Sequence, residues 1–220
     1  MIQRVWEGAR TAKTLREVFV ATDDERIADC CKGFGAKVLM TRSDHPTGTD
    51  RLAEAASALP DDVIVNIQGD EPLIKGFVVD ILVETLTEAR CHGMATLVHA
   101  ADAADIENPN RVKVTLDRLG NALYFSRAPI PHPHHAHPDA MYWQHIGIYA
   151  YRKEFLMQFI QLTRTPAEIS EALEQLRALE HGLPIRVGKV EGWQSVAIDV
   201  PEDVKRAEEL LAQEVGSTTR

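Results

Sequence analysis

The chain is poor in cysteine and in long apolar runs. Its 220 residues include three cysteines, Cys30, Cys31 and Cys91. An odd number without a C-x-x-C pair argues against a disulfide framework. Largely apolar stretches such as residues 78–83 are far too short to cross a bilayer, and residues 1–16 contain no signal-peptide core. We therefore expect a cytoplasmic protein that is neither exported nor embedded in a membrane.

Positive charge is also scarce. Lys and Arg number 24 against 33 Asp and Glu, which gives a net charge of −9. An acidic surface repels phosphate backbones, so nucleic acid is not an expected partner. A small anionic substrate would have to be bound by local arginines or through a metal ion. The content of 45% hydrophobic and 26% charged residues is typical of an ordinary globular protein.

Hydrophobic periodicity predicts an α/β fold for the first half of the chain. Long helices alternate there with short strands, which indicates a mainly parallel sheet sandwiched by helices. The expected helices cover residues 2–13, 24–34, 49–59 and 75–90, and the expected strands cover residues 18–21, 37–40, 63–67 and 94–98.

The second half has a different pattern. Strands at 112–116 and 122–125 flank a turn at 117–121, and a further strand covers 145–151. This arrangement suggests that about residues 110–150 form an antiparallel insertion within a single domain of residues 1–220.

One continuous helix is predicted after the insertion. A capping box at Thr165 opens it, and Gly182 ends it. Its expected core stripe consists of Ile169, Leu173, Leu176 and Leu179. Glu174 and Gln175 lie beside this stripe, and the pattern alone predicts that both are solvated. Strands at 185–190 and 196–199 and a charged terminal helix follow.

An acidic loop follows the third strand. The β-forming run 62–67 leads directly into Gln68, Gly69, Asp70, Glu71 and Pro72. In open α/β sheets, ligands bind at the carboxyl ends of the strands, so Asp70 lies where a cation or a substrate would bind. The alternative is a solvated loop that is merely acidic.

A second carboxylate, Asp199, stands between an apolar segment and Pro201. Together, Asp70 and Asp199 would suit one magnesium ion, which takes oxygen ligands and keeps waters and substrate phosphates in its other positions. Taken alone, Asp199 is more typical of an acid at a helix entry, stabilised by the helix dipole.

The loop before the helix at 49–59 resembles a ligand-binding turn. Gly48 allows a ligand to approach the backbone N–H groups closely. Capping of the helix by Thr47 or Thr49 is the ordinary alternative. Arg51 lies in the first turn, where a cation is mildly unfavourable, and this indicates a specific partner.

Polar residues of the second half would line a sugar-sized pocket. Arg127 lies between small residues and prolines and would suit a carboxylate or phosphate, although a surface arginine is equally consistent. His145 and Tyr149 are four residues apart on a strand and therefore point to the same face. The histidine-rich segment 132–137 is expected to be an exposed loop without a physiological metal.

Seven segments together resemble the 3-deoxy-manno-octulosonate cytidylyltransferases, also called CMP-Kdo synthetases. They follow in the family's order over nearly the whole chain: 21–24 (ATDD), 41–51 (TRSDHPTGTDR), 66–72 (NIQGDEP), 124–131 (YFSRAPIP), 145–149 (HIGIY), 173–177 (LEQLR) and 199–203 (DVPED). The resemblance implies a fold like that of the nucleotide-diphospho-sugar transferases, with an insertion that forms a homodimer. It also implies cytidylyl transfer from CTP to 3-deoxy-D-manno-octulosonate (Kdo), giving CMP-Kdo and pyrophosphate for lipopolysaccharide biosynthesis.

The resemblance also implies roles for individual residues. Asp70 and Asp199 would bind Mg²⁺, and Gln68 would contact both substrates near the reacting centre. The cytosine base would be read by the loop residues Thr47, Gly48, Thr49 and Arg51. Kdo would be surrounded by Arg127, His145, Tyr149, Glu174 and Gln175.

One part of the family pattern has no counterpart in residues 1–220. It is an initial strand with a basic loop, resembling Pro-Ala-Arg-x-x-Ser-x-Arg-Leu-Pro-Gly-Lys-Pro, that holds the triphosphate. We therefore expect activity to depend on a longer natural chain, and neighbouring strands to have unpaired edges. Two alternatives stay open: a non-catalytic sugar-acid-binding or dimerising subunit, and the same fold acting on sialic acid or another sugar.

Overall fold

The computed structural model describes residues 1–135, 141–198 and 200–217. The chain divides into two compact units. Unit 1 consists of Met1–Leu59, Ile67–Asp80 and Gln194–Arg220, and unit 2 consists of Pro60–Asn66 and Ile81–Trp193. No helix among the described residues is long and apolar enough to cross a membrane.

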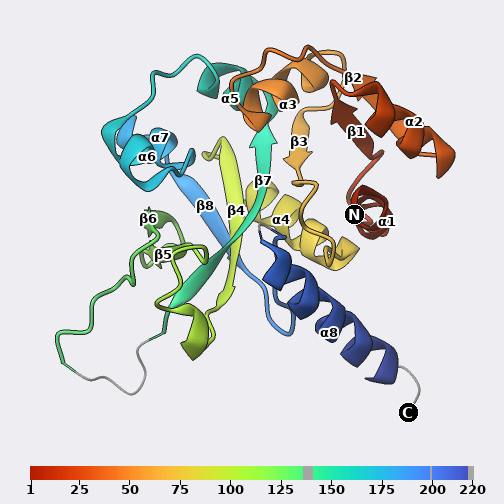
Figure 1. Ribbon diagram of the computed structural model, residues 1–220. Helices are drawn as coiled ribbons and strands as arrows, with labels where there is room; N and C mark the ends of the chain where they lie inside the picture. The colour runs from red at the N-terminus through yellow and green to blue at the C-terminus, as the bar shows by residue number, and fades with distance from the viewer. Residues whose placement is uncertain (136–140, 199, 218–220) are drawn as a thin grey trace. The chain divides into compact units, whose positions relative to one another are not determined.

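Unit 1 is built on a two-stranded parallel sheet. β1 (Phe19–Thr22) pairs in register with β2 (Lys37–Met40). The connecting helix α2 (Glu25–Gly33) packs on both strands, and α3 (Gly48–Ser57) packs on β1 (Figure 1). Gly35 follows α2 with a φ of +85°, which suits glycine at the end of a helix, as the sequence predicted.

Two small apolar clusters stabilise unit 1. The first joins α1 (Ile2–Ala9) to the sheet and consists of Trp6, Val20, Cys31 and Ala36. The second joins the loop after Asp70 to α8 (Pro201–Ser217) and consists of Leu73, Val196 and Ala207. Burial of these side chains fixes the segments that carry the acidic loop.

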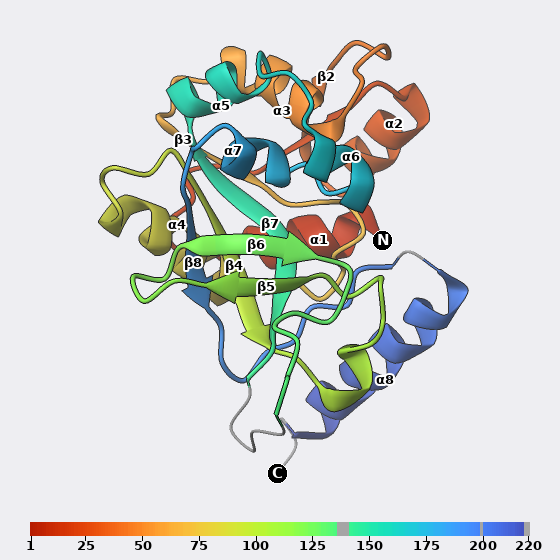
Figure 2. The ribbon, with the colours of Figure 1, turned by 90° about the vertical axis from the view of Figure 1, so that its left-hand side faces the viewer.

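Unit 2 contains a mixed six-stranded sheet in the order β6–β5–β7–β4–β8, with β3 also paired to β7. The strands are β3 (Val63–Asn66), β4 (Met94–Ala100), β5 (Lys113–Leu116), β6 (Ala122–Ser126), β7 (Trp143–Arg152) and β8 (Ile185–Lys189). Figure 2 shows the β5–β6 hairpin beside the long strand β7. The predicted antiparallel excursion is therefore present, and β7 is the strand that ties it to the rest of the sheet.

The helices of unit 2 surround this sheet. They are the 3₁₀ helix η1 (Ala103–Asp105), α5 (Lys153–Phe159), α6 (Pro166–Glu171) and α7 (Leu176–Glu180), while α4 (Gly76–Glu88) begins in unit 1 and continues into unit 2. The short helix α5 was not predicted, because no side-chain cap marks its start. It packs on β7, from which it continues directly.

The α/β class is confirmed, but the sheet is less parallel than the first half of the sequence suggested. Among the strands of the described residues, only the β1–β2 and β4–β8 pairs are parallel. β7 runs antiparallel to β3, β4 and β5. The reason is that β7, which follows the β5–β6 hairpin, runs back through the middle of the sheet. Hydrophobic periodicity does not reveal the direction in which a strand runs.

The helix predicted over residues 165–181 is two helices. The capping box at Thr165 is present, but Ala172 adopts a left-handed conformation with a φ of 51° and ends α6. Ile169 of the expected core stripe is 59% exposed, whereas Leu173 and Leu176 are buried. The strand predicted at 196–199 is not formed over its described residues 196–198. The other eight predicted strands are present.

Five strands have one open side among the described residues. β1 and β2 pair only with each other, and β3, β6 and β8 each pair with a single neighbour. Such edges expose unpaired N–H and C=O groups.

Candidate functional site

The loop that starts α3 is organised by Thr47. Its Oγ1 accepts a hydrogen bond from the Asp50 N–H at 3.2 Å and lies 2.7 Å from the Asp50 carboxylate, so Thr47 is the helix cap. Thr49 is buried. Gly48 is exposed and lies beside Gln68, since a Cβ added at Gly48 would be 3.7 Å from Gln68 Nε2. The structure thus brings together two of the predicted nucleotide residues.

Arg51 has the specific partner that its position in the first turn indicated. Its Nη1 lies 2.9 Å from Asp23 Oδ1, at the end of β1, and donates to Thr41 Oγ1, after β2, at 2.7 Å. The hydrogen bond from Arg51 is the main cause that lowers the pKa of Asp23. Arg51 therefore connects the ends of both strands to α3.

The acidic loop carries Gln68, which is exposed, and Asp70, which is half-buried. The next residue, Glu71, is buried, and the Ser195 hydroxyl lies 2.8 Å from both of its carboxylate oxygens. The backbone N–H of Ile198 donates to the Asp70 carbonyl at 2.9 Å. The chain segment that leads to Asp199 therefore runs beside Asp70, while Asp199 itself lies outside the described residues.

The donors of this loop suit a hard cation. No group of three His, Cys, Asp or Glu side chains able to hold a metal occurs in the described part of the chain. Magnesium needs no such group, because one or two carboxylates and the substrate phosphates complete its octahedron. The Asp70 carboxylate fits that requirement. Of the histidine-rich loop, residues 132–135 are exposed, as expected, and His137 lies outside the described residues.

His145 lies on β7 beside Tyr149, with ring centroids 5.4 Å apart, as the strand pattern predicted. Its Nε2 lies 2.9 Å from Thr96 Oγ1, and that hydroxyl also lies 2.8 Å from the Ile148 carbonyl. Because a carbonyl only accepts, the Thr96 proton goes to Ile148, and His145 Nε2–H then donates to Thr96. The other ring nitrogen, Nδ1, therefore carries no proton and can accept a hydrogen bond.

Burial controls the charge of both aromatic residues. It lowers the pKa of His145 to about 3, so the imidazole is neutral near pH 7. Burial, followed by the charges of Tyr151 and Glu174, raises the pKa of Tyr149 well above its usual value. The two side chains can therefore offer a ligand neutral hydrogen-bonding groups.

Glu174 and Gln175 lie at the break between α6 and α7. Gln175 is only 5% exposed, so the pattern-based expectation that it is solvated is wrong. Its buried Nε2 has no hydrogen-bond partner among the described residues. Glu174 is half-buried, 3.5 Å from Arg177 Nη2, and close enough to Tyr149 to raise its pKa. The break places a carboxylate and an amide donor near β7.

Arg127 is half-buried and binds backbone carbonyls. Its guanidinium donates to Glu171 at 2.7 Å, Pro109 at 3.0 Å and Ala172 at 3.4 Å. The fully buried Lys113 in turn donates to the Arg127 carbonyl at 2.8 Å. Arg127 therefore holds the end of β6 against the end of α6.

Unit 2 thus gathers His145, Tyr149 and Glu174, and unit 1 gathers Gly48, Gln68 and the Asp70 loop. Thr96, on the mainly apolar strand β4, was not predicted as a site residue. The buried pair of Glu168 and Arg177, in which Arg177 Nη2 lies 2.6 Å from Glu168 Oε1, was not predicted either. In the sequence, Thr96 is simply a polar residue on a buried strand, and Glu168 is explained by the capping box. Neither position indicates the contact that the structure shows.

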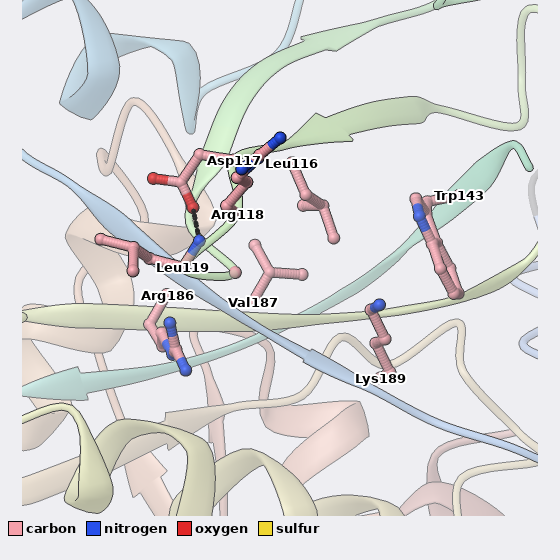
Figure 3. Close-up of a pocket in the computed structure, with 9 residues that line it drawn as sticks. Leu116, Asp117, Arg118, Leu119, Trp143, Arg186, Val187 and Lys189 are labelled. Carbon is pink, nitrogen blue, oxygen red and sulfur yellow. Dashed lines mark hydrogen bonds between the residues drawn. The ribbon is translucent and has the colours of Figure 1, made fainter.

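A cationic crevice lies at the edge of unit 2. Arg118 in the β5–β6 turn, Arg186 and Lys189 of β8, and Trp143 line it (Figure 3). The Lys189 ammonium lies 4.4 Å from the centre of the Trp143 ring. None of the predicted site residues lines this crevice.

Known proteins are similar in sequence to nearly the whole of this chain. A family model described as Cytidylyltransferase matches residues 1–187. The 3-deoxy-manno-octulosonate cytidylyltransferase of Syntrophotalea carbinolica is 48% identical over 96% of this chain and 88% of its own length. The enzyme of the same name from Escherichia coli is 41% identical over 98% of this chain and 87% of its own length.

Solved structures agree with this grouping. A structure of CMP:2-keto-3-deoxy-manno-octonic acid synthetase complexed with CTP matches with a TM-score of 0.90 and 41% identity, over 97% of this chain and 88% of that one. The 4-diphosphocytidyl-2C-methyl-D-erythritol synthase of Anaerococcus prevotii, at 12% identity and a TM-score of 0.61 over 96% of this chain and 85% of that one, shares the fold alone. The chain therefore belongs to the cytidylyltransferases, and among them to the 3-deoxy-manno-octulosonate cytidylyltransferase (CMP-Kdo synthetase) family.

Proposed function

We propose that this protein transfers the cytidylyl group of CTP to Kdo and releases pyrophosphate, as a step in lipopolysaccharide biosynthesis. The observation that carries the proposal is 41–48% identity, over 96–98% of the chain, with enzymes named for this reaction. The structure adds an exposed glycine, Gly48, in the loop before α3 and a half-buried, neutral polar cluster around His145.

In the reaction, the anomeric hydroxyl oxygen of Kdo attacks the α-phosphorus of CTP. A new phosphorus–oxygen bond forms, the bond to the β-phosphate oxygen breaks, and pyrophosphate leaves with that bonding electron pair. The hydroxyl proton is released to solvent. No covalent enzyme intermediate is needed, so the protein contributes mainly by positioning and by electrostatic stabilisation.

Asp70 and Asp199 would hold Mg²⁺ in this reaction. When bound, the ion neutralises charge on the triphosphate oxygens. The proposal is supported by the oxygen chemistry of Asp70 and by the hydrogen bond between Ile198 and Asp70, which aligns the segment before Asp199 with the acidic loop.

Each unit would bind one substrate group. In unit 1, Thr47, Gly48, Thr49 and Arg51 would form the cytosine site, with Gln68 near the reacting centre. In unit 2, Arg127, His145, Tyr149, Glu174 and Gln175 would bind Kdo. Its hydroxyl groups suit the acceptor at His145 Nδ1, the Glu174 carboxylate and Gln175 Nε2, which has no hydrogen-bond partner within the described part of the chain.

Three further features belong to the proposal. We expect the chain to act as a single nucleotidyltransferase domain and to form a homodimer through the β insertion at about residues 110–150. A cytoplasmic location is supported by Cys30, Cys31 and Cys91, which are all free thiols.

The test is an assay of pyrophosphate release with CTP, Kdo and Mg²⁺. Because the family pattern includes an N-terminal basic loop, the assay compares residues 1–220 with a version that carries this loop. We expect CMP-Kdo to form with the extended version, and N-acetylneuraminate in place of Kdo to give little product.

Two results would count against the proposal. Absence of CMP-Kdo from both versions refutes cytidylyl transfer to Kdo. Kdo binding in a calorimeter without any pyrophosphate release favours a sugar-acid-binding subunit instead.

A further inference from the structure

The break between α6 and α7 is held in place by a buried ion pair. Arg177 Nε and Nη2 donate to the two carboxylate oxygens of Glu168 at 2.8 and 2.6 Å. The two side chains are only 5% and 4% exposed. Two parallel hydrogen bonds fix the relative orientation of both groups, so the first helix is locked to the second across the break.

Both members of the pair have additional fixed contacts. Glu168 completes the capping box of α6 by accepting from the Thr165 N–H at 3.3 Å. The Arg177 guanidinium lies over the Phe159 ring, 5.1 Å from its centre. Burial alone would raise the pKa of Glu168, but the hydrogen bonds and charge of Arg177, together with hydrogen bonds from Thr165 and Arg164, outweigh burial and lower it. Glu168 is therefore ionised at neutral pH, and the pair persists.

The start of the break is clamped separately. The Glu171 carboxylate accepts from Ser126 Oγ at 2.6 Å and from the Arg127 N–H at 2.9 Å. The carbonyls of Glu171 and Ala172 accept from the Arg127 guanidinium. The segment 172–175 is thus fixed to β6 at one end and to the Glu168–Arg177 pair at the other.

This double attachment determines where Glu174 and Gln175 lie. A continuous helix would have kept both beside the core stripe, whereas the left-handed turn at Ala172 redirects the chain. Arg177 Nη2 also lies 3.5 Å from Glu174 Oε1, so the same guanidinium reaches both glutamates. Because Arg177 Nε and Nη2 both bind Glu168, the guanidinium contacts Glu174 at this longer distance.

We propose that Glu168 and Arg177 are positioning residues for the sugar acid: the buried pair holds the α6–α7 break and aims Glu174 and Gln175 at the ligand beside Tyr149. This inference rests on the proposed function, because it assumes that Glu174 and Gln175 contact Kdo. It adds that Arg177, which does not contact the ligand itself, sets Kdo affinity without affecting CTP.

The test measures KM for each substrate, kcat and the thermal midpoint in Arg177→Met, with Arg164→Met as its matched control. Arg164 contacts the same Glu168 oxygen at 3.2 Å but is 64% exposed. We expect Arg177→Met to raise KM for Kdo more than about tenfold and to leave KM for CTP within about twofold. Arg164→Met should leave both values within about twofold.

A stability loss is separated from positioning by two further variants. Arg177→Met leaves Glu168 buried without its partner and can prevent folding, whereas the double variant Glu168→Met with Arg177→Met replaces the pair by apolar groups and should fold. We expect this folded double variant to show a raised KM for Kdo, as Arg177→Met does. Arg177→Lys, which keeps the charge but not the bidentate geometry, should recover only part of the Kdo affinity.

A folded double variant with unchanged KM for Kdo would overturn the inference. An equal rise of both KM values in Arg177→Met would also overturn it, because that result indicates general damage. If neither residues 1–220 nor the version that carries the N-terminal basic loop makes CMP-Kdo without these substitutions, the proposed function fails instead, and the two failures are distinguishable in one assay.

Discussion

The two units present the proposed site residues in different ways. In unit 1, Gln68 and Gly48 are exposed and depend on a capped helix and a short loop. In unit 2, Gln175 is buried and His145 and Tyr149 are half-buried, and burial alters the pKa values of His145 and Tyr149. An exposed loop with accessible backbone N–H groups suits hydrated ligands such as phosphates and a metal ion. A polyhydroxy acid instead needs neutral donors and acceptors in fixed positions. Packing and hydrogen bonds from neighbouring residues must hold such groups in place.

The largest expected effect is in unit 1. Asp70→Asn removes the charge that would hold Mg²⁺, and we expect kcat to fall by roughly 10²–10³-fold. The pyrophosphate assay at increasing Mg²⁺ concentration measures this loss. The control is Asp44→Asn, an exposed acid of the loop before α3, which should keep wild-type activity. Wild-type activity in Asp70→Asn at low Mg²⁺ would remove Asp70 from the site.

A change in unit 2 should separate affinity from stability. Gln175→Met removes a buried amide whose nitrogen has no partner in the described residues. Since an unsatisfied buried donor costs about 1–3 kcal/mol, the free protein should be as stable as wild type or more so. We expect KM for Kdo to rise at least about tenfold. A lower thermal midpoint with unchanged KM would show that Gln175 is a structural residue.

Thr96 should have a smaller effect through His145. Thr96→Val keeps the shape of the side chain but removes the hydroxyl that accepts from His145 Nε2. Loss of one hydrogen bond of about 1 kcal/mol predicts a several-fold rise in KM for Kdo. Thr87→Val, on the exposed side of α4, is the control. Equal KM values for both variants would contradict an orienting role of Thr96.

The titration of His145 tests whether its ring in unit 2 is shielded from water. Because its folded-state pKa is lowered to about 3 from 6.5, the unfolded chain binds a proton at a higher pH than the folded one. Stability therefore falls as the pH decreases from 6.5 towards 3. NMR of the imidazole carbons should show no titration of His145 between pH 8 and pH 5. A midpoint near 6.5 would mean that water reaches the ring.

The smallest effect is expected at the cationic crevice. Replacing Arg118 and Lys189 by Ala removes charge there but touches none of the proposed substrate residues. We expect kcat and both KM values to stay within about twofold of wild type. A tenfold change in either KM would show that this edge of unit 2 takes part in substrate binding.

The sequence predicted some of these features and could not predict others. Thr47, Gly35 and the Asp70 loop were readable because caps, helix stops and strand-end acids are local in sequence. The pairing of His145 with Tyr149 followed from strand periodicity. The left-handed turn at Ala172 was not readable, since alanine gives no signal for it. The burial of Gln175 depends on this turn and was missed for the same reason.

The most direct test of the account is ³¹P NMR of the protein, carrying the family's basic loop, with CTP, Kdo and Mg²⁺. We predict that the CTP signals give way to one phosphodiester signal of CMP-Kdo and to pyrophosphate in equal amounts. CTP that stays intact, or that yields CMP instead of a sugar phosphodiester, would contradict cytidylyl transfer to the sugar acid.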